Sequence, residues 1–428
     1  MKQLVLRLLA GGRIRSLPAL TSFVIVVFAL GNIVLGHGLE NALGGPVGGD
    51  FLAFYTGGSF ARRGLSGQLL NIDAQHKFQE QVLGVTTSYT AVWIHPPYLA
   101  WLFSPFSRLP YLPAYALFVL LSGASFAFSL RALRRELKLE HSTPKLLWFS
   151  AQYFPTLHWL LNGQTTGIWL SVLSWVFIWL RRERDIAAGL LLGLFVCKPP
   201  LALGVAASLL GAKRFRCLAG VGVTTFALLG VGLYFSPGAM ADYAGHAAMI
   251  ASLNRGGGIP AAGLHGSFEF ATLLLDGISH VAATCLGAAL VLTLFTLLLV
   301  MWHRWGWSRG TRAWDLRMAA TLAIGVVLSP HLFLYDLTLL VLPLCILMAW
   351  YPKRAPALPL DGDKLLASTA IVVVLGLVGP VLTAGMLKAS VRCLGAPVAV
   401  QLGVVAIALW AFLVARAAEP EGAASRAD

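Results

Sequence analysis

An aspartate stands at the head of an aromatic-rich stretch, GGDFLAFYTGGSFARRG, which begins at Gly48. Carboxylates are scarce in this chain, because only 18 of its 428 residues are Asp or Glu. A carboxylate such as Asp50 can take the proton of a hydroxyl group or orient that hydroxyl for attack, which is the task of a general base. Asp is also a favoured residue at helix N-caps. Asp50 is therefore a candidate catalytic base, with helix capping as the competing interpretation.

Further polar residues with suitable chemistry lie in short motifs along the chain. Lys198 in CKPP offers a point charge that pairs well with phosphate, although a lysine can also snorkel to a membrane interface. His331 in SPHLFLYD is an alternative base. The other candidates for contact with substrate or donor phosphate are Gln164, Arg255, Tyr55, His95, His265, Tyr335 and Asp336. Each of these has a structural alternative, which is to satisfy a helix end or a tight turn.

Metal-ligand motifs with clustered spacing, such as HExxH, do not occur in the sequence. We therefore predict no metal site and no required cofactor, while a divalent cation remains compatible with the chemistry. The five cysteines all lie in or beside apolar segments and form no disulfide framework.

The composition indicates the kind of protein that must position these residues. Hydrophobic residues make up 57% of the chain and charged residues 12%, and the mean hydropathy is +0.76. Soluble domains carry about 25% charged residues, so the sequence predicts an all-α polytopic membrane protein. We expect about twelve membrane-spanning helices, within a range of ten to thirteen. The apolar segments are 17–35, 112–130, 146–161, 165–180, 186–210 (two short helices meeting at Lys198), 218–235, 281–302, 318–328, 332–350, 365–387 and 397–414.

The distribution of charge predicts the orientation. With a cytoplasmic N-terminus, about three quarters of the 32 Lys and Arg residues fall on the inner side, as the positive-inside rule requires. The net charge of +14 is then a topology signal, and nucleic acid is not an expected partner. Both termini are predicted to be cytoplasmic, and the first apolar segment is predicted to be an uncleaved anchor in a bacterial cytoplasmic membrane.

Two long loops are predicted on the outer side of a single membrane domain, 1–428. The first, 36–111, contains Asp50 and an expected amphipathic helix at the membrane interface, followed by a short re-entrant or interfacial helix that begins near His95. The second spans 236–280. The glycines before Asp50 are expected to leave room for a substrate. On this topology, Asp50, Gln164, Lys198 and Asp336 converge on one leaflet.

The ordered motifs GDFLAFYTGG, HPPYLAWLFSPFSRLPYLPAYAL, NGQTTG, AAGLLLGLFVCKPPLAL and SPHLFLYDLTLLVLP resemble glycosyltransferase family 87. This family comprises polyprenol-phosphate-dependent, mannosyltransferase-like membrane enzymes of the GT-C fold. The resemblance covers residues 48–343, with a looser match to the end. It implies transfer of a sugar, with mannose expected, from a polyprenyl-phosphate-sugar donor to a lipid or glycan acceptor at the periplasmic or extracellular face. It also implies that an acid in the first outer loop, here Asp50, lies near the catalytic centre.

A single displacement of polyprenyl phosphate would invert the anomeric centre, with Asp50 at the acceptor and Lys198 at the departing phosphate. Three other functions remain open. A transporter or flippase of lipid-linked saccharides would show inverted repeats with broken helices in both halves, whereas only CKPP is an obvious break. An oligosaccharide polymerase or ligase would concentrate its charges in a later outer loop. A structural membrane subunit would not require Asp50 and Lys198 on the same side.

Overall fold

The computed structural model describes residues 12–245, 264–275, 278–329 and 332–350. Within these ranges the regular elements are helices, with isolated bridges such as His37 to Glu40, so the predicted all-α class is confirmed for this part of the chain. The helices before the Lys198 break, with 3₁₀ helices labelled η, are α2 (Gly12–Val34), α3 (Phe51–Arg62), η1 (Ser66–Gln68), α4 (Ile72–Leu83), α5 (Pro97–Phe103), η2 (Phe106–Arg108), α6 (Tyr111–Leu137), α7 (Thr143–Ala151), α8 (Phe154–Leu161), α9 (Thr166–Arg181), α10 (Asp185–Leu192) and η3 (Gly193–Cys197). Those after it are η4 (Pro199–Ala202), α11 (Leu203–Gly211), α12 (Phe215–Phe235), α13 (Pro237–Gly245), α15 (Ser267–Leu275), α16 (His280–Arg304), α17 (Arg312–Val327), η6 (Leu334–Leu340) and α18 (Val341–Trp350).

Three described helices, α6, α12 and α16, are long and apolar enough to cross a membrane. Shorter apolar helical segments occur at Ser22–Val34, Thr166–Arg181, Asp185–Cys197, Pro199–Gly211 and Leu334–Trp350. The chain is thus a membrane protein, but the expected count of about twelve crossings is not confirmed. The last two predicted spans, 365–387 and 397–414, lie outside the described residues.

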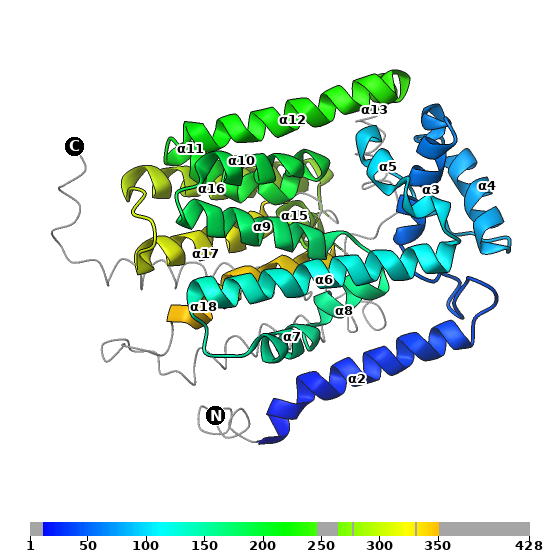
Figure 1. Ribbon diagram of the computed structural model, residues 1–428, viewed down its shortest axis with the longest axis horizontal. Coiled ribbons are helices and arrows are strands. Elements are labelled where there is room, and N and C mark those ends of the chain that lie inside the picture. Colours follow the sequence, from blue (N-terminus) through cyan, green and yellow to red (C-terminus); the bar gives the residue numbers. More distant parts are fainter. Residues whose placement is uncertain (1–11, 246–263, 276–277, 330–331, 351–428) are drawn as a thin grey trace.

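The long helices form a bundle, and the helices of the first outer loop gather at one end of it. α6 packs on α9, α10 on α12 and α11 on α16, while α2 lies along the lower side of the view and contacts α8 (Figure 1). α3, α4 and α5 lie together at the right of the view, beyond the body of the bundle (Figure 1). α13, from the second outer loop, contacts α5, so the two predicted outer loops meet at this end.

The first helix of the outer loop differs in its surroundings from our expectation. α3 forms where the sequence predicted a helix, but every residue from Phe51 to Ala61 is buried within the protein, so it does not present the exposed face expected of an amphipathic helix. α4, α5, η2 and α6 pack around it, and the ring of Phe54 stacks on Phe103 at 4.6 Å. The loop folds on itself and covers both faces of the helix, which explains why apolar residues occur around its whole circumference.

Two helix breaks place polar residues at this same end. Lys198 separates η3 from η4 with non-helical backbone angles (φ −147°, ψ 65°), as predicted, because the residue before a proline is disfavoured in the helical region. The predicted single segment 146–161 is instead two helices, α7 and α8, and Pro155 occupies the first turn of α8. Proline favours a new helix start because it cannot donate to a preceding turn.

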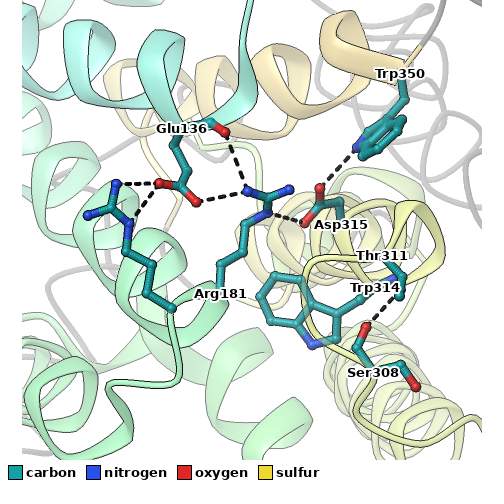
Figure 2. Close-up of polar contacts among 8 residues, drawn as sticks. Glu136, Arg181, Ser308, Thr311, Trp314, Asp315 and Trp350 are labelled. Carbon is teal, nitrogen blue, oxygen red and sulfur yellow. Dashed lines mark hydrogen bonds and ion pairs between the residues drawn. The ribbon is translucent and has the colours of Figure 1, made fainter.

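The opposite end of the bundle is held by buried ion pairs. Arg181 lies between Glu136, at 2.8 Å, and Asp315, at 3.0 Å, and Asp315 also accepts a hydrogen bond from the indole of Trp350 (Figure 2). Arg182 pairs with the other oxygen of Glu136. Since the 16 residues of α9 extend about 24 Å, this network is far from the polar residues at the other end of α9.

A second charged group joins the remaining short loops at that end. Asp185 pairs with Arg309 at 2.7 Å and also with Arg214. The predicted inner loops thus contact one another, which agrees with the division of the polar residues into two faces.

Candidate active site

The Asp50 carboxylate is held by side-chain amides from the end of α8. Its Oδ2 accepts a hydrogen bond from Asn162 Nδ2 at 2.8 Å and from Gln164 Nε2 at 2.6 Å. The hydroxyl of Tyr89 lies 3.5 Å from Oδ1, and the phenol of Tyr335 also interacts with the carboxylate. Asp50 occupies the N-cap position of α3, yet its side chain makes no capping hydrogen bond. The capping interpretation is therefore wrong for the side chain.

The glycine before Asp50 makes room for the protein itself. Gly49 has a positive φ of +51°, and a Cβ atom built there would lie 1.8 Å from Asn162 Oδ1. Asn162 thus occupies the place that a side chain at position 49 would take, while Gly48 and Gly49 both border an open cavity. A side chain larger than hydrogen at position 49 would push Asn162 away from the carboxylate that it holds.

Burial sets the protonation behaviour of Asp50. Removal from water raises the pKa of its carboxyl above the ordinary value, because desolvation penalises the charged form. The hydrogen bond from Gln164, the charge of Lys198 and the hydrogen bonds from Asn162 and Tyr89 lower the pKa in the opposite direction. A carboxylate whose pKa is raised is a stronger base than an ordinary aspartate, which suits it to accept a proton.

Lys198 forms an ion pair with Asp336 beside Asp50. Its Nζ lies 2.7 Å from Asp336 Oδ1, which also accepts a hydrogen bond from Thr166 at 3.0 Å. Asp336 is fully buried, and its Oδ2 has no hydrogen-bond partner among the described residues. The ammonium also lies 5.3 Å from the centre of the Tyr335 ring. The lysine is thus oriented by a carboxylate and an aromatic face.

His95 lies close to the same lysine. Burial, together with the charge of Lys198, lowers the pKa of His95 to about 3, so its ring is neutral at physiological pH. The ring stacks on Phe54 at 5.2 Å and meets Trp93 edge to face. His95 therefore offers a neutral hydrogen-bonding edge in a rigid aromatic setting.

Of the remaining predicted residues, Tyr55 and His265 are described, and Arg255 and His331 lie outside the described ranges. Tyr55 does not join the cluster, because its hydroxyl donates to the Leu109 carbonyl and its ring packs among aromatic side chains of the first outer loop. His265 is buried, and its backbone N–H donates to the Leu332 carbonyl at 2.7 Å, next to the η6 region.

Besides Thr166, which donates to Asp336, three residues of the site were not predicted: Asn162, Tyr89 and His158. Asn162 belongs to the NGQTTG motif, so the motif could have indicated it. Tyr89 and His158 do not belong to any motif recognised in the sequence. All three line a cavity of about 290 Å³ that also borders Gly48 and Gly49. The ring of His158 stacks on Tyr335 with 5.7 Å between centroids.

The described residues contain no group of three or more His, Cys, Asp or Glu side chains arranged to hold a metal ion. The site instead combines a buried carboxylate, a lysine and uncharged polar groups. Such a set can accept a proton from a hydroxyl at one position and stabilise an anionic leaving group at another.

Comparison with known proteins agrees with this chemistry. The pattern of glycosyltransferase family 87 matches residues 93–330, which is more than half of the 428-residue chain and includes Asn162, Gln164 and Lys198. Asp50 and Asp336 lie outside the matched segment and join the site through the contacts described above. No curated protein and no solved structure matches the chain. The family match identifies a membrane glycosyltransferase, and the chain belongs to glycosyltransferase family 87.

Proposed function

We propose that the protein transfers a sugar from a polyprenyl-phosphate-linked donor to a hydroxyl group of a lipid or glycan acceptor, with inversion at the anomeric carbon. The observation that carries this proposal is the position of the buried Asp50 carboxylate beside Lys198, whose charge acts on it. A base and a cation at neighbouring positions match the two ends of a displacement at an anomeric carbon.

Asp50 acts on the acceptor. As the acceptor oxygen bonds to the anomeric carbon, its proton passes to the Asp50 carboxylate. The amides of Asn162 and Gln164 both donate to Oδ2, whereas Oδ1 has the long contact to Tyr89, and the Tyr335 phenol also interacts with the carboxylate. Contacts near 3.5 Å are weak, so Oδ1 is the oxygen that takes the proton.

Lys198 acts on the leaving group. The bond between the anomeric carbon and the phosphate oxygen breaks, and its electron pair leaves with polyprenyl phosphate. The Lys198 ammonium carries three N–H donors. One of them donates to Asp336 Oδ1 at 2.7 Å, so the others remain for phosphate oxygens. Asp336 and Thr166 position the lysine, and Tyr335 supports it from one face. His95 and Gln164 bind the sugar hydroxyls as neutral groups.

The donor sugar in this proposal is mannose, the sugar that the family resemblance implies. The reaction takes place at the outer face of a bacterial cytoplasmic membrane, with both termini in the cytoplasm. The lipid tail of the donor lies between helices while its head group enters the polar end of the bundle. The family match favours sugar transfer over the transporter and structural-subunit alternatives.

The test is a transfer assay with purified protein in proteoliposomes. Polyprenyl-phosphate mannose, glucose and galactose are compared as donors with the corresponding nucleotide sugars, and the anomeric configuration of the product is determined. The proposal predicts consumption of the polyprenyl-phosphate donor and an α-linked product from a β-linked donor. Transfer from a nucleotide sugar alone, or movement of labelled lipid across the membrane without sugar consumption, would contradict it.

A further inference from the structure

The cavity beside Asp50 is bounded by α2 and the segment that follows it, by Tyr89, and by α8 with Asn162 at its end. α2 contributes Ala29, Asn32 and Ile33, the segment 41–49 contributes another wall, and α8 contributes His158 and Leu161. Its volume of about 290 Å³ is at the lower end of the range for small-molecule sites, roughly 300 to 1,000 Å³. The cavity has room for a compact group rather than for a long chain.

The lining of this cavity is neutral. Its polar members are amides, a phenol and an imidazole, contributed by Asn32, Asn41, Tyr89, His158 and Asn162, and none of the described residues that line it is Lys, Arg, Asp or Glu. A phosphate would require cationic partners there, whereas sugar hydroxyls pair well with neutral donors and acceptors. Lys198 is not among the lining residues, so we expect the donor phosphate to bind at Lys198 and not in this cavity.

Two lining side chains lack internal hydrogen-bond partners. His158 Nδ1 is buried and makes no hydrogen bond within the described part of the chain. The side-chain amide of Asn32 likewise has no hydrogen bond to another described residue, although its backbone carbonyl accepts from Ala42. Asn41 differs, because its Oδ1 accepts from two backbone N–H groups and orders the turn around it. His158 Nδ1 is closed off from the cavity, whereas the partly exposed Asn32 amide is available to hydrogen-bond a ligand there.

Two residues that line the cavity also contact the Asp50 carboxylate. Tyr89 and Asn162 line the cavity and also contact opposite oxygens of the carboxylate, Oδ1 at 3.5 Å and Oδ2 at 2.8 Å. A hydroxyl that enters from the cavity can take the place of the long Tyr89 contact at Oδ1. Asp50 thus lies between an uncharged chamber and the lysine.

We propose that this cavity, between α2, the 41–49 segment and α8, is the acceptor subsite and takes an uncharged glycosyl or polyol group whose reactive hydroxyl meets Asp50 Oδ1. The side-chain amide of Asn32, which lines the cavity, binds a further hydroxyl of the same group. The inference rests on the proposed transferase function, since an acceptor site exists only if sugar is transferred. The glycosyl group can belong to a lipid head group or to a free glycan, and the two sources share this chemistry.

The test uses substitutions in α2 that fill the cavity or remove one of its polar side chains. Ala29→Phe places a ring into it, while Leu30→Phe adds the same ring at the next position of α2, which does not line the cavity. Asn32→Ala removes a polar wall without filling space. Wild type and variants are placed in lipid nanodiscs and assayed with polyprenyl-phosphate mannose. The acceptor probes are methyl and hexyl glycosides of mannose, glucose and galactose, whose binding to the protein is also measured directly.

The account predicts that Ala29→Phe raises the acceptor KM at least about tenfold, the effect of losing one well-placed group of contacts, and leaves the donor KM unchanged. Asn32→Ala gives a smaller rise, and Leu30→Phe behaves as wild type. Preference for hexyl over methyl glycosides would identify a lipid source, and equal use of both a free glycan. A rise in donor KM in Ala29→Phe, or wild type that binds no glycoside of the panel, would overturn the subsite while leaving donor consumption intact. Failure of wild type to consume any polyprenyl-phosphate sugar would instead overturn the transferase proposal.

Discussion

The side-chain amide of Gln164 donates a 2.6 Å hydrogen bond to Asp50 Oδ2 across 114 positions of the chain. Gln164 follows α8 in the bundle, whereas Asp50 precedes α3 in the first outer loop. This contact joins the two parts at the reacting group. It also determines which carboxylate oxygen is occupied and which remains available to a substrate.

Gly49→Ala tests the fit between the two parts. The new methyl group would meet Asn162 Oδ1 at 1.8 Å and displace the amide from Asp50. Because small displacements of catalytic groups are costly, kcat is expected to fall by roughly 10- to 100-fold. Gly44→Ala is the matched control, since Gly44 also has a positive φ, +81°, but open space around it. Equal losses in both variants, measured at equal folded protein, would show that backbone strain alone is responsible.

Gln164→Ala is expected to change the pH dependence of the reaction. The carboxylate is the active form, so activity is lost as pH falls through the pKa of Asp50. Burial raises that pKa and the Gln164 hydrogen bond lowers it. Removal of Gln164 therefore raises the pKa further, and the acidic limb of the kcat/KM profile moves to higher pH. A lower rate with an unmoved acidic limb would limit Gln164 to a structural role.

Variants of the Lys198 and Asp336 ion pair are expected to affect protein stability and donor binding differently. Lys198→Met leaves a fully buried carboxylate unpaired, which costs about 3 to 5 kcal/mol and raises the donor KM. Adding Asp336→Asn removes the charge and restores thermal stability, but not donor affinity, because no cation remains for the phosphate. Thermal unfolding in detergent and donor titrations measure the two effects. Recovery of donor affinity in the double variant would exclude phosphate contact by Lys198.

Arg181→Met tests the far end of the bundle. Its guanidinium bridges Glu136 and the buried Asp315 (Figure 2), so its loss should destabilise the fold by about 3 to 5 kcal/mol. Arg182→Met removes a partner of Glu136 whose side chain is 54% exposed, and should cost less than about 1 kcal/mol. Neither variant should change the donor KM of the folded fraction. A specific effect on donor KM in Arg181→Met would mean that the two ends are coupled.

The elements that position the site were largely predictable from local pattern. The proline pair after Lys198 predicts the helix break that places the lysine, and the prolines near His95 predict the short helix α5. Loop charge placed Arg181 and Asp315 on the face opposite Asp50. These features depend on neighbouring residues or on membrane orientation, and both can be predicted from a single sequence.

The contacts within the site were not predictable. The burial of α3 depends on helices that fold over it, and an apolar stretch alone does not distinguish a buried helix from an interfacial one. The sequence predicted Asp50 and Gln164 as separate candidates. Their hydrogen bond joins distant parts of the chain, and no local pattern predicts it. Tyr89 and His158 enter the site only through the packing of the first outer loop and α8 against the cavity.

Asp50→Asn is the most direct test of the central claim, which is that this carboxylate takes the acceptor proton. The amide keeps the size of the side chain and can still accept from Asn162 and Gln164, so the fold should be retained. Asp73→Asn, at an exposed acid in the first turn of α4, is the matched control. Sugar transfer from the polyprenyl-phosphate donor that wild type uses is measured at saturating donor and acceptor. The account predicts a fall in kcat of about 10²- to 10⁴-fold for Asp50→Asn and wild-type rates for Asp73→Asn. A folded Asp50→Asn protein that transfers sugar as fast as wild type would contradict it.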